Sequence, residues 1–107
     1  VINGAVAALP LLRETPGARI VNTASVAGIV GAPKLAVYVA SKFGVRGLTE
    51  ALDAEYSRYG VRVTSLMPWF VDTAILDNTG GAGSNRRLRD QLTDSKTPIY
   101  PVRMAAE

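Results

Sequence analysis

The spacing of apolar residues predicts four regular elements in the first two thirds of the chain. Apolar side chains recur at helical spacing in residues 1–13, and a second helical run extends over residues 37–59. Two short runs rich in β-branched residues, 19–25 and 61–67, are typical of strands. A strand, a long helix and another strand form a βαβ unit, so we expect a parallel sheet in an α/β fold.

Turn-forming residues separate and follow these elements. Residues 26–34 are expected to form a loop, and Gly60 is expected to cap the long helix in a left-handed conformation. Residues 86–94 are expected to form a short helix. We interpret the longer stretch 74–97 as a substrate lid that covers a site.

Small residues form a stripe along the long helix. They step by four, three, four and three positions, which places them on one helical face: Ala40, Gly44, Gly47, Ala51 and Ala54. Such a stripe lets another surface approach closely. Two surfaces remain open as its partner: the helix's own sheet, or a helix of a partner subunit. The stripe lies almost opposite Tyr38 and Lys42.

The overall composition narrows the possible chemistry. The chain has 107 residues, a net charge of +3 and neither cysteine nor histidine. These counts are typical of one globular domain, and they exclude disulfides, Cys/His metal sites and a Ser-His triad within the chain. No apolar run reaches the roughly 18 residues of a membrane span. The absence of cysteine fits a reducing, cytoplasmic location.

Positive charge gathers near the end of the chain, in Arg86-Arg-Leu-Arg89. Aromatic side chains do not interleave with these arginines, as they do in proteins that bind single-stranded nucleic acid. We therefore interpret the cluster as the solvated face of a helix and not as a nucleic-acid site.

A tyrosine and a lysine stand four residues apart at the start of the long helix, at Tyr38 and Lys42. Residues i and i+4 share one helical face, so the phenol and the ammonium are expected side by side. A fixed cation favours the phenolate form of a tyrosine, as does the positive end of the helix dipole. The pair is therefore a candidate general acid/base, with two unrelated surface residues as the alternative.

Two further segments follow the carboxyl ends of the predicted strands. Ser25 ends the first strand, and Trp69 to Thr73 follow the second strand beyond Pro68. Ligands of open parallel sheets bind at that edge, so both segments are expected at one site. A simple turn or cap is the alternative role for Ser25. For Trp69 and Phe70 we predict core packing beneath a loop.

Three stretches of the chain combine into one pattern. They are Arg19-Ile-Val-Asn-Thr-Ala-Ser-Val-Ala-Gly28, Tyr38-Val-Ala-Ser-Lys42 and the segment 61–73, and the serine precedes the tyrosine by 13 positions. Together they resemble the classical branch of the short-chain dehydrogenase/reductase family. The resemblance covers residues 1 to about 76. It implies part of a Rossmann-type, doubly wound parallel sheet whose first strands are missing.

The resemblance implies a role for each matching residue. Tyr38 would be the acid/base that exchanges a proton with a substrate carbonyl or hydroxyl oxygen. Lys42 would promote proton loss from Tyr38 and bind the ribose hydroxyls beside the nicotinamide. Ser25 would donate a hydrogen bond to the substrate oxygen. The activity implied is an NAD- or NADP-dependent interconversion of a small-molecule alcohol and a carbonyl compound by hydride transfer.

The same resemblance implies cofactor-binding residues after the second strand. Pro68, Val71 and Thr73 match the family loop that holds the nicotinamide, and the residues after Thr73 match its substrate lid. Trp69 stands where the family usually has glycine. We therefore expect Trp69 to crowd the nicotinamide pocket or to reshape its wall.

Other features of the family lie outside the chain as given. The glycine-rich turn TGxxxGxG and the residue that selects NAD or NADP have no counterpart, and the catalytic asparagine would precede Val1 by about four residues, so it is not Asn3. We interpret residues 1–107 as a single partial domain. We expect it to be unstable alone, because its sheet edges would lack partners. The family also implies a homodimer or homotetramer, formed through two long helices, when the fold is complete.

Two other functions remain as alternatives. The first is a non-catalytic, binding-only protein that kept the fold, which the intact Ser25, Tyr38 and Lys42 argue against. The second is an epimerase or dehydratase of the family's extended branch. That branch shares the Tyr-x-x-x-Lys motif, but the segment 68–73 fits the classical branch better.

Overall fold

A computed structural model describes residues 1–78 and 86–105 of the chain. Its elements in order are α1 (Ile2–Arg13), β1 (Arg19–Thr23), the 3₁₀ turn η1 (Val26–Gly28), α2 (Ala36–Tyr56), η2 (Ser57–Tyr59), β2 (Arg62–Leu66), α3 (Ile75–Asn78), α4 (Leu88–Asp94) and η3 (Val102–Ala105). The helices and strands that the spacing predicts are all present, and each of their ends lies within three residues of the predicted one. In the part of the chain that the structure describes, no helix is both long and apolar enough to cross a membrane.

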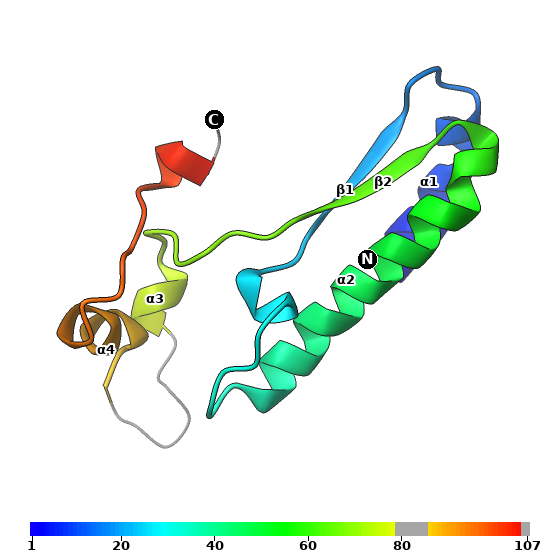
Figure 1. Cartoon of the computed structure of the whole chain (residues 1–107). Coiled ribbons are helices and arrows are strands. Elements are labelled where there is room, and N and C mark those ends of the chain that lie inside the picture. Colours follow the sequence, from blue (N-terminus) through cyan, green and yellow to red (C-terminus); the bar gives the residue numbers. More distant parts are fainter. Residues whose placement is uncertain (79–85, 106–107) are drawn as a thin grey trace.

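The two strands pair in parallel, with Arg19 opposite Arg62 at the start of the ladder. Successive side chains of a strand point to opposite faces of a sheet. Asn22 and Val63 are buried on one face, and α1 and α2 lie along that face together (Figure 1). The structure therefore confirms the predicted α/β class and the parallel βαβ unit.

The core lies toward the beginning of both strands and the end of α2. It contains small, branched and aromatic side chains from the helices and the sheet: Ala5, Ala18, Leu52, Tyr56, Val61 and Val63. Val61 is fully buried. Immediately before it, Gly60 ends η2 with a φ of 73°, a left-handed conformation that glycine adopts without steric cost. The predicted left-handed cap is confirmed, and it lets the chain turn from α2 into β2.

The opposite face of the sheet is open. Val21 is 62% exposed and Leu66 is 47% exposed. The chain exposes 7323 Å² in total, whereas a compact monomer of 11.3 kDa exposes about 5,700 Å². Within the described residues each strand has one neighbour only, so both outer edges of the sheet lack a partner. These surfaces support the expectation that the chain is unstable by itself.

The stripe of small residues on α2 does not face the sheet. All five members are exposed: Ala40, Gly44, Gly47, Ala51 and Ala54. A Cβ added at Gly44 or Gly47 would meet nothing within 4 Å. The helix instead buries Thr49, Leu52 and Tyr56. The prediction that the stripe packs on the helix's own sheet is wrong, because α2 buries a different face, which carries Leu52 and Tyr56. A partner subunit stays a prediction.

After β2 the chain leaves the sheet and forms a separate group of elements, which we call the C-terminal region (residues 68–78 and 86–105; Figure 1). In this region α3 and α4 pack together, and Leu76 and Leu92 are its buried apolar residues. Both helices belong to the segment predicted to be a substrate lid. The middle of that segment, residues 79–85, lies outside the described residues.

A short backbone pairing ties the beginning of the C-terminal region to its end. Tyr100 donates its N–H to the Phe70 carbonyl at 2.9 Å, and its own carbonyl accepts from the Asp72 N–H at 2.8 Å. Trp69 packs edge-on against Phe70, with ring centroids 5.4 Å apart, but it is 44% exposed. The prediction of core packing is therefore wrong for Trp69, because nearly half of its surface remains exposed.

Candidate active site

Ser25 lies where the pairing of β1 and β2 continues beyond the strands. Ala24 donates its N–H to the Leu66 carbonyl at 2.9 Å, and Val26 donates to the Pro68 carbonyl at 3.1 Å. These two bonds hold Ser25 beside Pro68. Two of the predicted segments therefore meet at the carboxyl edge of the sheet, where open parallel sheets bind their ligands.

The Ser25 side chain caps η1. Its Oγ accepts a hydrogen bond from the Ala27 N–H at 3.2 Å, so Ser25 has the cap role that was considered as the alternative. A hydroxyl group has one donor and two acceptor sites, and this bond uses one acceptor site. The Ser25 proton remains available to donate. Capping and hydrogen bonding to a substrate are therefore compatible.

Gly28 brings η1 into direct contact with the backbone of α2. A Cβ placed on Gly28 would lie 2.8 Å from the Lys42 carbonyl oxygen, which is closer than real Cβ atoms approach. Arg46 adds a hydrogen bond from its Nη1 to the Gly28 carbonyl at 3.5 Å. Because Gly28 has no side chain, the turn after Ser25 packs directly against the helical turn that carries Lys42.

Tyr38 and Lys42 occupy the first two turns of α2 and share one face, as their spacing predicts. The Lys42 ammonium lies over the Tyr38 ring, with Nζ 5.6 Å from the ring centroid. The same Nζ donates a hydrogen bond to the carbonyl of Thr23, the last residue of β1, at 3.3 Å. Lys42 therefore connects the helix to the strand end that precedes Ser25. Tyr38 is 41% exposed.

Val71 and Thr73 lie further along, in the C-terminal region. Val71 forms an isolated bridge with Tyr100, and Thr73 donates its hydroxyl to the Val71 carbonyl at 3.4 Å. Among the described residues, no hydrogen bond or ion pair joins Val71 or Thr73 to Tyr38 or Lys42. These two predicted residues are therefore attached to the C-terminal region and not to the helix.

A buried polar pair fixes α2 against β1. Asn22 Nδ2 donates to Thr49 Oγ1 at 3.0 Å, and the Thr49 hydroxyl donates to the Val45 carbonyl at 2.7 Å. Asn22 and Thr49 are both buried, so leaving either group unpaired would be costly. This pair was not among the residues predicted from sequence. The available signal was a polar Asn22 inside a run of β-branched residues.

A charged pair near the other end of α2 joins that helix to β2. Arg62 donates two hydrogen bonds to Asp53, at 2.9 and 3.1 Å. These bonds, with that from the Val63 N–H, hold the pKa of Asp53 below its ordinary value.

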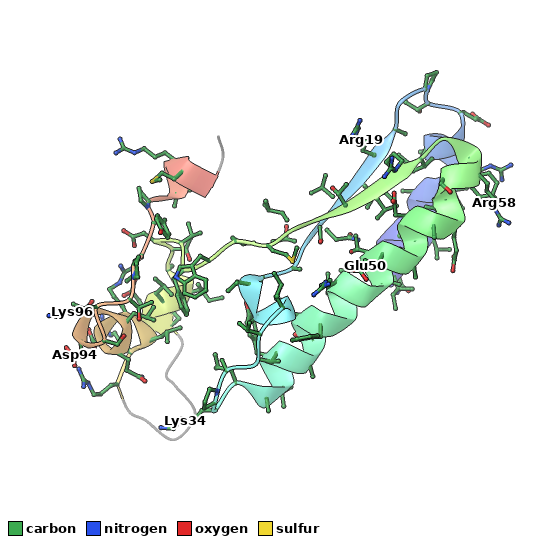
Figure 2. The ribbon with its side chains drawn as sticks, in the orientation of Figure 1. Arg19, Lys34, Glu50, Arg58, Asp94 and Lys96 are labelled. Atoms are coloured by element: carbon green, nitrogen blue, oxygen red, sulfur yellow. The ribbon has the colours of Figure 1, made fainter. Side chains whose placement is uncertain are left out.

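Figure 2 shows Lys34 in the loop before α2 and Arg58 at the opposite end of that helix. Among the described residues, no cluster of three or more metal-ligating side chains occurs.

Residues 1–82 match the family model described as short chain dehydrogenase. The chain belongs to the short chain dehydrogenase family. It is 41% identical over 68 residues to a cyclohexanol dehydrogenase from Acinetobacter sp. (strain SE19), a match that covers 64% of this chain and 27% of that enzyme. It is 48% identical over 73 residues to a 2,5-dichloro-2,5-cyclohexadiene-1,4-diol dehydrogenase from Sphingobium indicum, over 64% of this chain and 29% of that enzyme.

A solved structure shares the fold of this chain. It is a gluconate 5-dehydrogenase from Burkholderia cenocepacia J2315 in complex with NADP and tartrate, with a TM-score of 0.68 at 27% identity. The match covers 87% of this chain and 35% of that chain. The chain thus spans about a third of the length of the relatives it matches, between 27 and 35% for the three named here. It contains part of a Rossmann-type sheet, as expected.

The residues at the edge of the sheet fit the nicotinamide end of a dinucleotide cofactor. An ammonium group has three N–H donors. One N–H donor of the Lys42 ammonium is used by the Thr23 carbonyl. The remaining donors are left for ribose hydroxyls. The glycine-rich turn that would cradle the phosphates has no counterpart in this chain. The fit therefore concerns the nicotinamide end alone.

Proposed function

We propose that this protein is an NAD- or NADP-dependent oxidoreductase that interconverts a small-molecule alcohol and its carbonyl compound, with Tyr38 as the acid/base. The observation that carries the proposal is the position of the Lys42 ammonium. Its Nζ lies 5.6 Å from the Tyr38 ring centroid and 3.3 Å from the Thr23 carbonyl. A cation held from two sides beside an exposed phenol is an arrangement suited to proton transfer by tyrosine.

In the proposed reaction, Tyr38 gives a proton to the substrate oxygen during carbonyl reduction and takes it back during alcohol oxidation. Ser25 donates its O–H to the same oxygen and stabilises the charge that develops there. Lys42 orients Tyr38 and binds the ribose of the cofactor. A bound nicotinamide supplies the hydride chemistry.

The proposal assigns Pro68, Val71 and Thr73 to the nicotinamide side of the site. The bond between the Pro68 carbonyl and Val26 supports this assignment, because it holds the start of the segment beside Ser25. The gluconate 5-dehydrogenase solved with NADP supports a dinucleotide cofactor. NAD and NADP are both to be tested.

The substrate class and the oligomer are also part of the proposal. The names of the two curated relatives refer to ring alcohols, so a cyclic secondary alcohol such as cyclohexanol is the first substrate to test. The exposed stripe of small residues on α2 supports a homodimer or homotetramer formed through long helices. The described parts of the predicted lid, residues 74–78 and 86–97, would belong to the substrate lid of this catalytic domain.

The decisive variant is Tyr38→Phe in the intact protein. Loss of the phenol oxygen should lower kcat by about 100- to 10,000-fold, because general acid–base catalysis contributes that much. The rate is followed by the absorbance of the reduced cofactor, with cyclohexanol and with NAD or NADP.

Tyr59→Phe is the matched control, because it removes the same oxygen at the other end of the fold. The guanidinium carbons of Arg13 and Arg58 lie 4.5 and 4.7 Å from the centroid of the Tyr59 ring. The rate of the Tyr59→Phe variant should equal that of the unmodified protein. Unchanged activity in Tyr38→Phe would overturn the proposal and favour a binding-only role. Product formed without net cofactor turnover would favour an epimerase or dehydratase.

A further inference from the structure

One arginine of α4 binds two aspartates from different parts of the C-terminal region. Arg89 binds Asp77 of α3 through two parallel bonds, Nε to Oδ1 at 2.7 Å and Nη2 to Oδ2 at 3.1 Å. Its third nitrogen, Nη1, lies 2.8 Å from Oδ1 of Asp72. A planar guanidinium can make this forked contact, and a lysine ammonium cannot. We call these three side chains the Arg89 clamp.

Asp72 stands between Val71 and Thr73, two of the residues that the proposed function assigns to the nicotinamide side of the site. The Asp72 N–H donates to the Tyr100 carbonyl at 2.8 Å, and the Tyr100 N–H returns a bond to the same segment at 2.9 Å. The segment is therefore held twice. Tyr100 holds its backbone, and Arg89 holds the Asp72 side chain.

Apolar packing contributes little at this place. The buried apolar residues of the described C-terminal region are Leu76 on α3 and Leu92 on α4. The Asp72 side chain is 55% exposed. Without the guanidinium, the two carboxylates would be neighbouring negative charges that repel each other. A backbone bond from the Leu76 N–H to the Thr73 carbonyl, at 3.1 Å, joins the segment to α3. The attachment of the segment to α4 depends on the charged contact between Asp72 and Arg89.

We propose that Arg89 is a positioning residue, which holds the segment 70–73 against α3 and α4 and thereby sets the nicotinamide side of the site. The role of that segment rests on the proposed function, whereas the clamp itself rests on the distances given above. Within the described residues, no hydrogen bond or ion pair joins the Arg89 side chain to Tyr38 or Lys42. Its effect on the site is therefore exerted through Asp72.

The test is Arg89→Met in the intact protein, followed by amide hydrogen exchange. Peptides that contain the Asp72 and Tyr100 amides should exchange about tenfold faster, because the segment that carries these bonds has lost its side-chain anchor. Arg89→Lys is the second variant. It keeps the positive charge but loses the fork, and it should show a smaller increase. If Arg89→Met does not fold, Arg89→Lys takes its place as the test.

Arg62→Met is the matched control. Arg62 makes the same two-bond contact with Asp53, at 2.9 and 3.1 Å, but between β2 and α2. The control therefore removes an exposed ion pair of the same kind from another part of the molecule. Exchange at Asp72 and Tyr100 should stay at the rate of the unmodified protein.

The second measurement is the dissociation constant of NAD and of NADP by calorimetry. Arg89→Met should weaken cofactor binding by about tenfold, and Arg62→Met should leave it unchanged. Unchanged exchange at Asp72 and Tyr100 in Arg89→Met would overturn the clamp. Faster exchange in Arg89→Met with unchanged cofactor affinity would overturn the proposal that the clamp sets the nicotinamide side of the site. If the unmodified protein binds neither dinucleotide, the proposed function and that link both fail, and exchange alone decides whether Arg89 holds the segment.

Discussion

The sheet-and-helix region (residues 1–67) and the C-terminal region are held together by different forces. The first buries an apolar cluster and the hydrogen-bonded pair Asn22–Thr49. The second buries only Leu76 and Leu92 among the apolar residues described there, and it relies in addition on the Arg89 clamp and on one backbone bridge at Tyr100. Buried contacts resist local opening more strongly than exposed charge pairs do.

This difference separates two tasks of the proposed enzyme. The candidate proton-transfer groups lie on the well-packed region, where Gly28 seats the turn after Ser25 against α2. The candidate lid and nicotinamide segment lie on the region that charge holds together. The first region should therefore respond to changes of volume, and the second to changes of charge and pH. The predictions below test that contrast, beginning with the largest expected effect.

The largest effect is expected from Gly28→Ala in the intact protein. The added Cβ would meet the Lys42 backbone at 2.8 Å, so η1 must move away from α2. We expect kcat to fall about 100-fold, because a displacement of about 1 Å near reacting groups has that effect. The free energy of unfolding should fall by about 1–3 kcal/mol through overpacking. Steady-state kinetics and urea denaturation measure both quantities.

Gly31→Ala is the control for this variant, because a Cβ at Gly31 meets nothing within 4 Å. It changes the same residue type in the same loop and should leave kcat and stability close to those of the unmodified protein. If Gly28→Ala behaves like Gly31→Ala, the close packing of η1 on α2 does not position the site.

A smaller effect is expected from Thr49→Val in the intact protein. The substitution keeps the volume but leaves the buried Asn22 amide without its acceptor. We expect the free energy of unfolding to fall by about 1–3 kcal/mol, the cost of an unpaired buried polar group. Urea denaturation measures the loss.

Thr93→Val serves as the comparison from the C-terminal region. Thr93 makes the same kind of bond as Thr49, from its hydroxyl to the carbonyl of the residue four positions before it. Thr93 is exposed and accepts nothing from a buried amide, so its loss should change stability little. Equal losses in the two variants would contradict the contrast between the regions.

The smallest effect concerns pH and the Arg89 clamp. The hydrogen bonds from Arg89 hold the pKa of Asp77 below its ordinary value of 3.8. A carboxyl group with a lowered pKa stabilises the folded state fully above its unfolded value, and this contribution is lost as the pH falls through the lower, folded value. Exchange at Asp72 and Tyr100, corrected for the intrinsic rate, should therefore be constant from neutral pH to 3.8 and faster below it.

Asp77→Asn removes the titrating group and should remove most of this acid response. Peptides of β2 provide the internal reference. Arg62 lowers the pKa of Asp53 in the same direction, and the Asp77→Asn substitution leaves this pair unchanged. An acid response that is the same in Asp77→Asn and in the unmodified protein would show that Asp77 is not its source.

Much of the fold could be predicted because periodicity is a local property. A helix or a strand repeats within a few residues, so apolar spacing predicted α1, α2, β1 and β2 and placed Tyr38 and Lys42 on one face. Burial is not local. Trp69 has the residue type of a core side chain, but its exposure depends on which elements cover it, and nearly half of its surface remains exposed.

By itself, the sequence determined which residues share a strand, a turn or a helical face, and its motifs led to the family. Only the tertiary structure decided which of those faces meet. Gly28 contacts Lys42 and Arg89 contacts Asp72 and Asp77 across loops that no spacing rule measures. These contacts depend on distances through space, which follow from how the chain folds back on itself and not from the period of any one element.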